Sequence, residues 1–218
     1  MSYRFILFDL DGTLLDTSCG VISAVKKTCK ALNLKALDEK TLKSFVGPVM
    51  QESFMKHYSM NKDQALKSAN LFREIYTKSL FDAQLYDGIL KLLKELKEKD
   101  VKIAVATNKS HDNAMKILDK FGILALCDFA MGSDLKGELK KADIVKECLN
   151  KLDAKKEQTC LIGDSEADLN GALANDIDFL AVLWGFGFKN KDELLNKQCK
   201  AVFESVNKLS EFLRSENA

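Results

Sequence analysis

The sequence of 218 residues has a single proline, Pro48, only two histidines, and no apolar run long enough to cross a membrane. Its six cysteines are widely and irregularly spaced, without a Cys-x-x-Cys pair. This spacing argues against a zinc site or a disulfide framework, so we expect reduced cysteines. The first residues lack the features of a signal peptide, and we expect a cytoplasmic protein.

Neither sign of charge dominates the sequence. Lysine and arginine number 33 and aspartate and glutamate 32, so no overall field attracts nucleic acid or an anionic membrane. We therefore expect neither as a partner, and any affinity for anions must be local. Nothing in the sequence requires more than a monomer, and the length suffices for a core domain with a smaller insertion.

Two aspartates, Asp9 and Asp11, follow an almost wholly apolar segment over residues 3–8. Such a segment predicts a strand buried on both faces, as in the middle of a parallel sheet. The period of two of a strand would place both carboxylates on the same side at the strand's carboxyl end, where ligands of such sheets bind. A plain Asp-Gly turn is the alternative.

The order of the predicted elements indicates an α/β fold with an all-helical insertion. Residues 17–83 show helical periodicity, and Asn61 with Gln64 forms a capping box before the last helix of this segment. Beyond it, helices and strands alternate, which predicts a parallel sheet with helices on both faces. The core would comprise residues 1–16 and 84–218. Its predicted strands span residues 3–8, 101–106, 129–131, 160–162, 179–183 and 201–203, and its helices span 89–96, 114–121, 142–152, 167–174 and a terminal stretch through residue 212.

Polar residues suited to phosphate chemistry follow two more of the predicted strands. Thr107 and Asn108 offer a hydroxyl, an amide and backbone N–H groups to phosphoryl oxygens. Asp164 stands at the exit of another strand, and Asp168 lies one helical turn later. Each fragment alone is also a common turn or helix cap, but their shared position at strand ends favours one site.

A magnesium site and a phosphate site are both compatible with these groups. Two carboxylates and a carbonyl oxygen make a hard oxygen site of the kind that Mg²⁺ prefers, with a substrate phosphate as a further ligand. A lysine, from the pair Lys140 and Lys141 at the start of a helix, would offset the negative charge. A phosphoryl group bound there can be attacked by an aspartate.

Four fragments of the chain, in this order, resemble the motifs of the haloacid dehalogenase-like superfamily. They are Asp9-Leu10-Asp11-Gly12-Thr13, Thr107-Asn108, a lysine at 141, and Gly163-Asp164 with Asp168. The resemblance covers nearly the whole chain. It implies a Rossmann-like core and a Mg²⁺-dependent phosphoric monoester hydrolase.

The resemblance assigns roles to the four aspartates. Asp9 would be the nucleophile that becomes an aspartyl-phosphate, and Asp11 the general acid for the leaving oxygen and then the base for water. Asp164 would bind Mg²⁺ together with Asp9 and the carbonyl of Asp11. Asp168 would orient these ligands.

The resemblance also implies a phosphate site. Thr107 and Asn108 would hold the phosphoryl group with backbone N–H groups near Leu10 and Gly12, and Lys141 would neutralise the charge between it and the nucleophile. Many relatives carry a proline after this lysine, which this chain lacks, so Lys140 is the alternative. Lys141 is favoured because it leads directly into the helix.

The helical insertion is similar to the cap domain of a subgroup with phosphoglycolate phosphatases, pyrophosphatases and 5′-nucleotidase-like phosphatases. Residues 45–48, 132–135 and 182–187 carry this likeness. It implies a helical cap domain over residues 17–83 that closes over the sheet edge, with Phe45, Gly47 and Pro48 facing the leaving group. A buried helix break is the alternative for these three. We expect a small phosphorylated metabolite as substrate: phosphoglycolate, a nucleotide or pyrophosphate.

Other members of such a superfamily provide alternative functions. A haloalkanoate dehalogenase has no need of Asp11, and a phosphonate hydrolase would need a Schiff-base lysine such as Lys43 or Lys56. A β-phosphoglucomutase-like phosphomutase shares every motif, and only the cap separates it from a phosphatase. A non-catalytic binding protein is disfavoured because the whole set of motif residues is intact.

Overall fold

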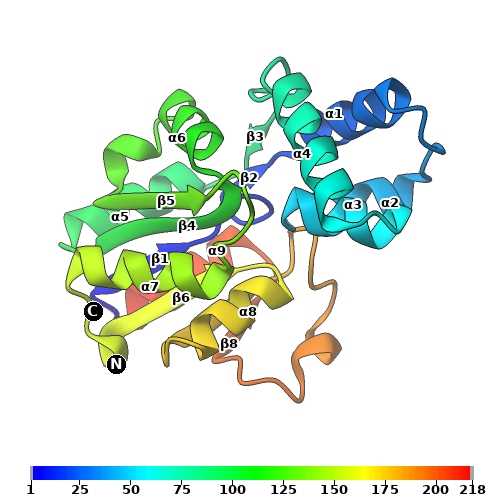
Figure 1. Cartoon of the computed structure of the whole chain (residues 1–218). Helices are drawn as coiled ribbons and strands as arrows, with labels where there is room; N and C mark the ends of the chain where they lie inside the picture. The colour runs from blue at the N-terminus through cyan, green and yellow to red at the C-terminus, as the bar shows by residue number, and fades with distance from the viewer. Residues whose placement is uncertain (1, 217–218) are drawn as a thin grey trace.

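The computed structural model describes residues 2–216 and shows a sheet flanked by helices, with a further group of helices to one side (Figure 1). The strands are β1 (Phe5–Phe8), β2 (Leu15–Asp16), β3 (Gln84–Leu85), β4 (Lys102–Ser110), β5 (Phe129–Ser133), β6 (Thr159–Gly163), β7 (Asp178–Val182) and β8 (Ala201–Phe203). The α-helices are α1 (Ser18–Ala31), α2 (Glu39–Lys43), α3 (Met50–Tyr58), α4 (Lys62–Tyr76), α5 (Ile89–Glu98), α6 (His111–Lys120), α7 (Lys141–Leu152), α8 (Glu166–Leu173) and α9 (Val206–Glu216). Short 3₁₀ turns are η1 (Leu124–Leu126), η2 (Lys156–Gln158) and η3 (Lys191–Leu194).

The main sheet has six parallel strands in the order β5-β4-β1-β6-β7-β8. The first strand of the chain is therefore central, with Phe8 opposite Val105 of β4 on one side and Ile162 of β6 on the other. Because parallel strands end at the same edge, the segments that follow β1, β4 and β6 meet there. The predicted parallel α/β fold is confirmed.

The central strand is buried on both faces, as its apolar sequence predicts. Ile6 and Phe8 point into a core shared with α5, α6 and α9, whereas Leu7 points into a second core shared with α7 and α8. All three side chains are completely buried. Each contributes about 1.5–3 kcal/mol relative to an exposed position, so both helical layers hold the strand that carries the first acid pair.

Strand β4 is longer than its apolar pattern predicts. It continues to Ser110 because its polar end still pairs with β5, with Thr107 opposite Gly132 and a shift in register before Ser110. Thr107 and Asn108 thus lie within the strand, whereas the sequence pattern placed them after it. Most other boundaries differ from the prediction by only a few residues.

Helices α1 to α4, here called the helical block, lie beside the carboxyl end of the sheet (Figure 1). The Asn61 capping box at the start of α4 is present as predicted. The chain enters and leaves the block through β2 and β3, which pair antiparallel with Leu15 opposite Leu85 and Asp16 opposite Gln84. Strands of two residues are too short for hydrophobic periodicity to predict them.

The six cysteines are free, in agreement with the prediction from their spacing. Cys29, Cys148 and Cys160 are buried among apolar side chains, where a thiol packs as a small hydrophobic group. Within residues 2–216, the helices are all too short or too polar to traverse a bilayer.

Gly20 allows helix α1 to lie against the segment that leaves the helical block. Its N–H donates to the carbonyl of Asp82 at 3.1 Å, and a Cβ at this position would overlap the carbonyl oxygen of Ser79. Gly20→Ala should therefore lower the free energy of unfolding by about 1–3 kcal/mol, despite its better helix propensity. Chemical denaturation measures this loss, and Lys27→Ala, on an exposed part of the same helix, should stay within about 0.5 kcal/mol of wild type. Equal stability of Gly20→Ala and wild type would contradict this packing.

Candidate active site

Asp9 and Lys141 form a buried ion pair at the carboxyl edge of the sheet. Asp9 directly follows β1, and its N–H donates to the carbonyl of Ile162 at 2.9 Å. Lys141 is the first residue of α7, and its Nζ lies 2.5 Å from Asp9 Oδ1 and 2.6 Å from Asp168 Oδ1. The lysine therefore bridges the first and fourth sequence fragments.

Burial and charge act in opposite directions on the pKa values of this pair. Burial raises the pKa of Asp9 well above its usual range, and the positive charge of Lys141 opposes that shift. Burial by itself would lower the pKa of Lys141, but Asp168 and Asp9 together raise it. The lysine thus remains charged between its two carboxylates.

The neighbouring Lys140 points elsewhere. Its Nζ lies 2.6 Å from Glu52 Oε1 of helix α3, and both side chains are largely exposed. Of the two lysines that the sequence left open, the structure places Lys141 beside the aspartates.

Asp164 is held at the end of β6 by backbone donors. Its Oδ2 accepts the N–H groups of Phe186 at 2.6 Å and Gly187 at 3.0 Å. Burial, reinforced by the negative charge of Asp168, raises the pKa of Asp164 to about 6. Gly12 lies against this carboxylate with a φ of +89°, and a Cβ there would overlap Asp164 Oδ2. Glycine is therefore required at position 12 for both its conformation and its lack of a side chain.

Asp168 completes a group of three buried carboxylates. Its Oδ2 accepts hydrogen bonds from Ser165, at 3.1 Å from the N–H and 2.6 Å from the hydroxyl. Carboxylate oxygens of Asp9, Asp164 and Asp168 all lie within 4.8 Å of one another. These are hard oxygen donors, and Lys141 is the one cation in ion-pair distance of them within residues 2–216. The cluster could hold a divalent metal ion.

Asp11 belongs to a second ion pair. Lys109 Nζ lies 2.9 Å from Asp11 Oδ1, and the hydroxyl of Thr17 donates to the same oxygen at 2.5 Å. Lys109 also reaches the hydroxyl of Tyr76 on α4, at 3.3 Å, and its Nζ lies 4.9 Å from the centre of that ring. A side chain of the core is thus joined both to Asp11 and to the helical block.

The predicted phosphate-binding residues lie near this second pair. Thr107 is buried, and its Oγ1 accepts the N–H of Lys109 at 3.2 Å. Asn108 Oδ1 is buried without a hydrogen-bond partner. The N–H of Gly12 donates to the carbonyl of Leu15 at 2.8 Å, so this group serves the turn that follows Leu10.

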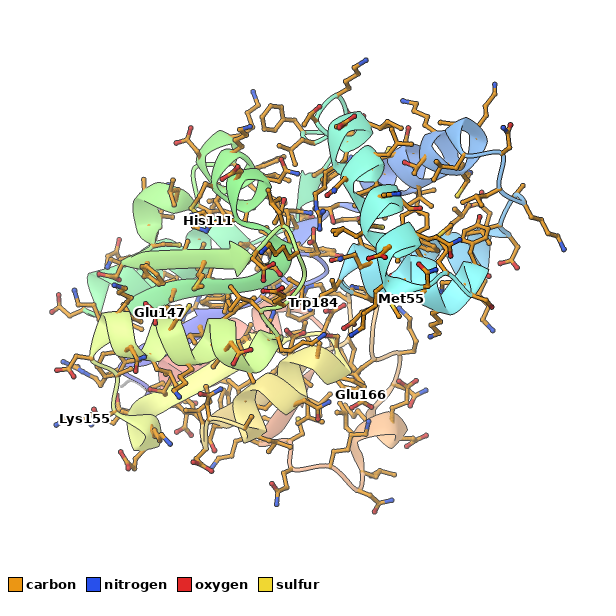
Figure 2. All side chains as sticks on the ribbon, in the orientation of Figure 1. Met55, His111, Glu147, Lys155, Glu166 and Trp184 are labelled. Atoms are coloured by element: carbon orange, nitrogen blue, oxygen red, sulfur yellow. The ribbon has the colours of Figure 1, made fainter. Side chains whose placement is uncertain are left out.

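The turn after Asp11 is anchored by a residue of the segment 182–187, to which the sequence assigned no individual role. Trp184 lies at the end of the sheet that faces the helical block (Figure 2). Its Nε1 donates to the carbonyl of Thr13 at 3.2 Å, and its ring meets that of Tyr86 edge-on. The loop that supplies the N–H donors to Asp164 therefore also fixes the first aspartate motif.

A cavity of about 50 Å³ lies between the strand ends and the helical block. Phe45, Gly47 and Pro48 line it from the block, and Asp11 and Asn108 line it from the core. Phe45 is also completely buried, with its ring centre 5.5 Å from that of Phe54. Phe45 therefore serves both as a core residue and as a wall of the cavity.

For several residues of this region, no role was predicted from the sequence. Lys109 directly follows the Thr107-Asn108 fragment, and recognising that β4 continues to Ser110 would have brought it to the site. Arg73 and Tyr76 come from an ordinary amphipathic helix, and Ser133, in the segment 132–135 that carries the subgroup likeness, ends a short strand and was assigned no role. No local pattern distinguishes such positions, because only the packing of the block against the sheet brings them to the cavity.

Comparison with known proteins supports one family. A family model described as haloacid dehalogenase-like hydrolase matches residues 6–182. A 5′-nucleotidase of Pseudomonas aeruginosa is 32% identical over 196 residues, which cover 89% of this chain and 88% of that protein. A phosphoglycolate phosphatase of Aquifex aeolicus is 32% identical over 200 residues, covering 84% and 86% respectively. A crystal structure described as a "predicted phosphatase" from Clostridium acetobutylicum superimposes with a TM-score of 0.92 at 33% identity, covering 99% of this chain and all of that one.

The raised pKa of Asp164 gives the metal-free protein a pH-dependent stability. A carboxyl whose folded pKa, about 6, exceeds its unfolded value of 3.8 stabilises the fold when protonated, and this contribution is lost as the pH rises from about 4 through 6. In EDTA, the free energy of unfolding of Asp164→Asn should therefore rise by about 1–3 kcal/mol relative to that of wild type as the pH increases across this window. Denaturation curves at several pH values measure the difference.

The exposed Asp119→Asn on α6 is the matched control and should show no such trend. A difference between Asp164→Asn and wild type that stays constant from pH 4 to pH 7 would contradict this assignment.

Proposed function

Because the chain belongs to the haloacid dehalogenase-like hydrolase family, we propose that it is a Mg²⁺-dependent phosphatase that hydrolyses a small phosphomonoester through an aspartyl-phosphate. The observation that carries this proposal is the position of Lys141, whose Nζ lies 2.5 Å from Asp9 Oδ1 and 2.6 Å from Asp168 Oδ1. A buried carboxylate kept beside a fixed ammonium group is suited to approach an anionic phosphate, because the lysine offsets the repulsion.

Asp9 acts as the nucleophile, and Asp11 acts first as the general acid and then as the general base. An oxygen of Asp9 attacks phosphorus while the bond from phosphorus to the leaving oxygen breaks, and Asp11 gives that oxygen a proton. Water then attacks phosphorus and passes a proton to Asp11, while the bond between phosphorus and Asp9 breaks. Inorganic phosphate leaves, and both carboxyl groups return to their initial state.

The remaining motif residues bind the phosphoryl group and the metal. The Thr107 hydroxyl, the Asn108 side chain and Lys141 would contact phosphoryl oxygens, with main-chain groups of the turn at Leu10 and Gly12 nearby. Mg²⁺ would be held by Asp9, Asp164 and the carbonyl of Asp11, with Asp168 orienting Lys141 and the carboxylates. The ion would supply positive charge to the phosphoryl oxygens.

The helical block is proposed to act as a cap domain. Residues 17–83 would form the cap and residues 1–16 with 84–218 the core, with the β2 and β3 pair as the hinge between them. Lys109 with Tyr76 and Lys140 with Glu52 connect the two parts in the present arrangement. Closure of the cap would exclude water while the phosphoryl group is transferred.

The two adjacent lysines give a matched test of the site. Lys141→Met should lower kcat/KM for phosphate release by about 100-fold or more, because the variant loses the charge beside the nucleophile. Lys140→Met removes only an exposed ion pair and should stay within about twofold of wild type. Asp9→Asn should lower the rate by at least about a thousandfold.

Phosphate release from a panel of phosphoglycolate, nucleotides, sugar phosphates and pyrophosphate measures these effects, with circular dichroism as the control for folding. Wild-type rates in Asp9→Asn, or a greater loss in Lys140→Met than in Lys141→Met, would refute the proposed site.

Mg²⁺ should stabilise the fold as well as support turnover. A ligand at ten to one hundred times its Kd raises the free energy of unfolding by about 1.4–2.7 kcal/mol. Asp164→Asn should lose this gain while remaining folded, and EDTA should abolish phosphate release by wild type. Thermal unfolding with and without Mg²⁺ checks the binding, and identical melting curves for wild type would contradict the assignment of the metal site.

A further inference from the structure

Arg73 on helix α4 lines the cavity beside Asp11 with no carboxylate partner of its own. Its Nη1 donates to Asn70 Oδ1 on the same helix at 2.7 Å, and no ion pair joins it to an acidic residue in the described chain from 2 to 216. Arg214, by contrast, makes three hydrogen bonds to Glu95. Burial lowers the pKa of Arg73, which reflects the removal of its guanidinium from water.

Two other charged side chains at the cavity, Lys109 and Asp134, already have partners within the protein. Lys109 is paired with Asp11 at 2.9 Å. Asp134, whose negative charge is felt by Arg73, accepts N–H groups from its own loop: those of Lys136 and Leu139 at 2.6 Å, and that of Glu138 at 3.3 Å. Arg73 is therefore the cation of this cavity that lacks an anionic partner at ion-pair distance.

Two residues that line the cavity each have a buried polar atom without a hydrogen-bond partner. Asn108 Oδ1 and Ser133 Oγ are buried without hydrogen-bond partners, and both residues line the cavity. Ser133 is only 3% exposed. Buried polar groups normally have partners, so these two residues retain hydrogen-bonding capacity for a polar molecule bound in the cavity.

The size of the cavity limits that molecule. A volume of about 50 Å³ accommodates roughly four water-sized groups. A two-carbon hydroxy acid or a phosphate ion has about five non-hydrogen atoms and is close to this size, whereas a nucleoside, with its base and ribose, would have to extend out of the cavity. The cavity adjoins Asp11, the proposed donor of a proton to the leaving oxygen, and is thus where the leaving group would lie.

We propose that Arg73 is a specificity-determining residue that selects substrates whose leaving group is small and negatively charged. This inference rests on the proposed phosphatase function and names its substrate class: phosphorylated short hydroxy acids or, with phosphate as a leaving anion of similar size, pyrophosphate. The guanidinium would bind the anion of the leaving group while the phosphoryl group lies beside Asp9. An arginine can bind either a carboxylate or a phosphate through two parallel N–H groups.

A pair of substrates that differ in one charge tests this proposal. 2-Phosphoglycolate ends in a carboxylate, and 2-hydroxyethyl phosphate ends in a neutral hydroxymethyl group of similar size. The kcat/KM of wild type should be at least about tenfold higher for 2-phosphoglycolate than for the neutral ester. In Arg73→Met, kcat/KM for 2-phosphoglycolate should fall by about 10- to 100-fold, because a hydrogen bond to a charged group is removed. The kcat/KM of the same variant for the neutral ester should differ from that of wild type by less than about threefold.

Two further variants complete the design. Lys67→Met removes a charge from an exposed position of the same helix and should leave both substrates unaffected. Arg73→Lys keeps the charge but not the planar donor group, and should recover part of the preference for the anionic substrate. Pyrophosphate and AMP, tested in parallel, distinguish an inorganic leaving group and a large leaving group from a hydroxy acid.

The outcomes separate this inference from the proposed function. Equal kcat/KM of wild type on the charged and neutral esters, an equal loss on both in Arg73→Met, or AMP as the best substrate would overturn the role of Arg73 while leaving the phosphatase intact. If wild type releases no more phosphate than Asp9→Asn from any substrate, the phosphatase proposal itself fails. Arg73-dependent hydrolysis of phosphoglycolate or pyrophosphate supports the inference and identifies which anion leaves.

Discussion

The buried contact of Lys141 with Asp9 and Asp168 is the interaction on which this site depends. Three carboxylates, including Asp164, share one lysine at the edge of the sheet, so one or two negative charges stay uncompensated. Such a cluster is costly to bury, and it persists because two cores hold the strands that carry it. Burial, reinforced by this negative charge, raises the pKa of Asp164, and the same charge gives the cluster its capacity for a divalent cation.

A second ion pair, between Lys109 and Asp11, connects the first aspartate motif to the helical block. Lys109 lies between Asp11 of the first motif and Tyr76 of α4, so the position of the block and the surroundings of Asp11 are physically coupled. In the proposed opening of the block, Lys109 would lose the contact with Tyr76 and could keep the one with Asp11, because Lys109 and Asp11 both belong to the core. Closing the block over a substrate would then complete the wall of the cavity around the leaving oxygen, beside the carboxyl group proposed as its general acid.

The motifs and the core were predictable from the sequence because both depend on short-range patterns. The apolar run before Asp9 marks a strand buried on both faces, and the carboxyl ends of parallel strands must meet, which brings Asp9 and Asp164 together. The positions of Lys109, Arg73 and Ser133 at the site were not predictable, because they meet only where side chains of α4 approach the ends of β4 and β5 around the cavity. The same limit applied to β2 and β3, whose pairing joins residues that are almost seventy positions apart.

In the proposed mechanism Asp9 carries the phosphoryl group and Asp11 is needed to release it. An activated ester such as para-nitrophenyl phosphate has a leaving group that departs without a proton, so Asp11→Asn should form the aspartyl-phosphate and fail to hydrolyse it. Acid quenching followed by mass spectrometry of the peptide that contains Asp9 is the most direct measurement. We expect one added phosphoryl group on Asp9 in the Asp11→Asn protein. A release of para-nitrophenol beyond one equivalent without any phosphoryl group on Asp9 would contradict this mechanism.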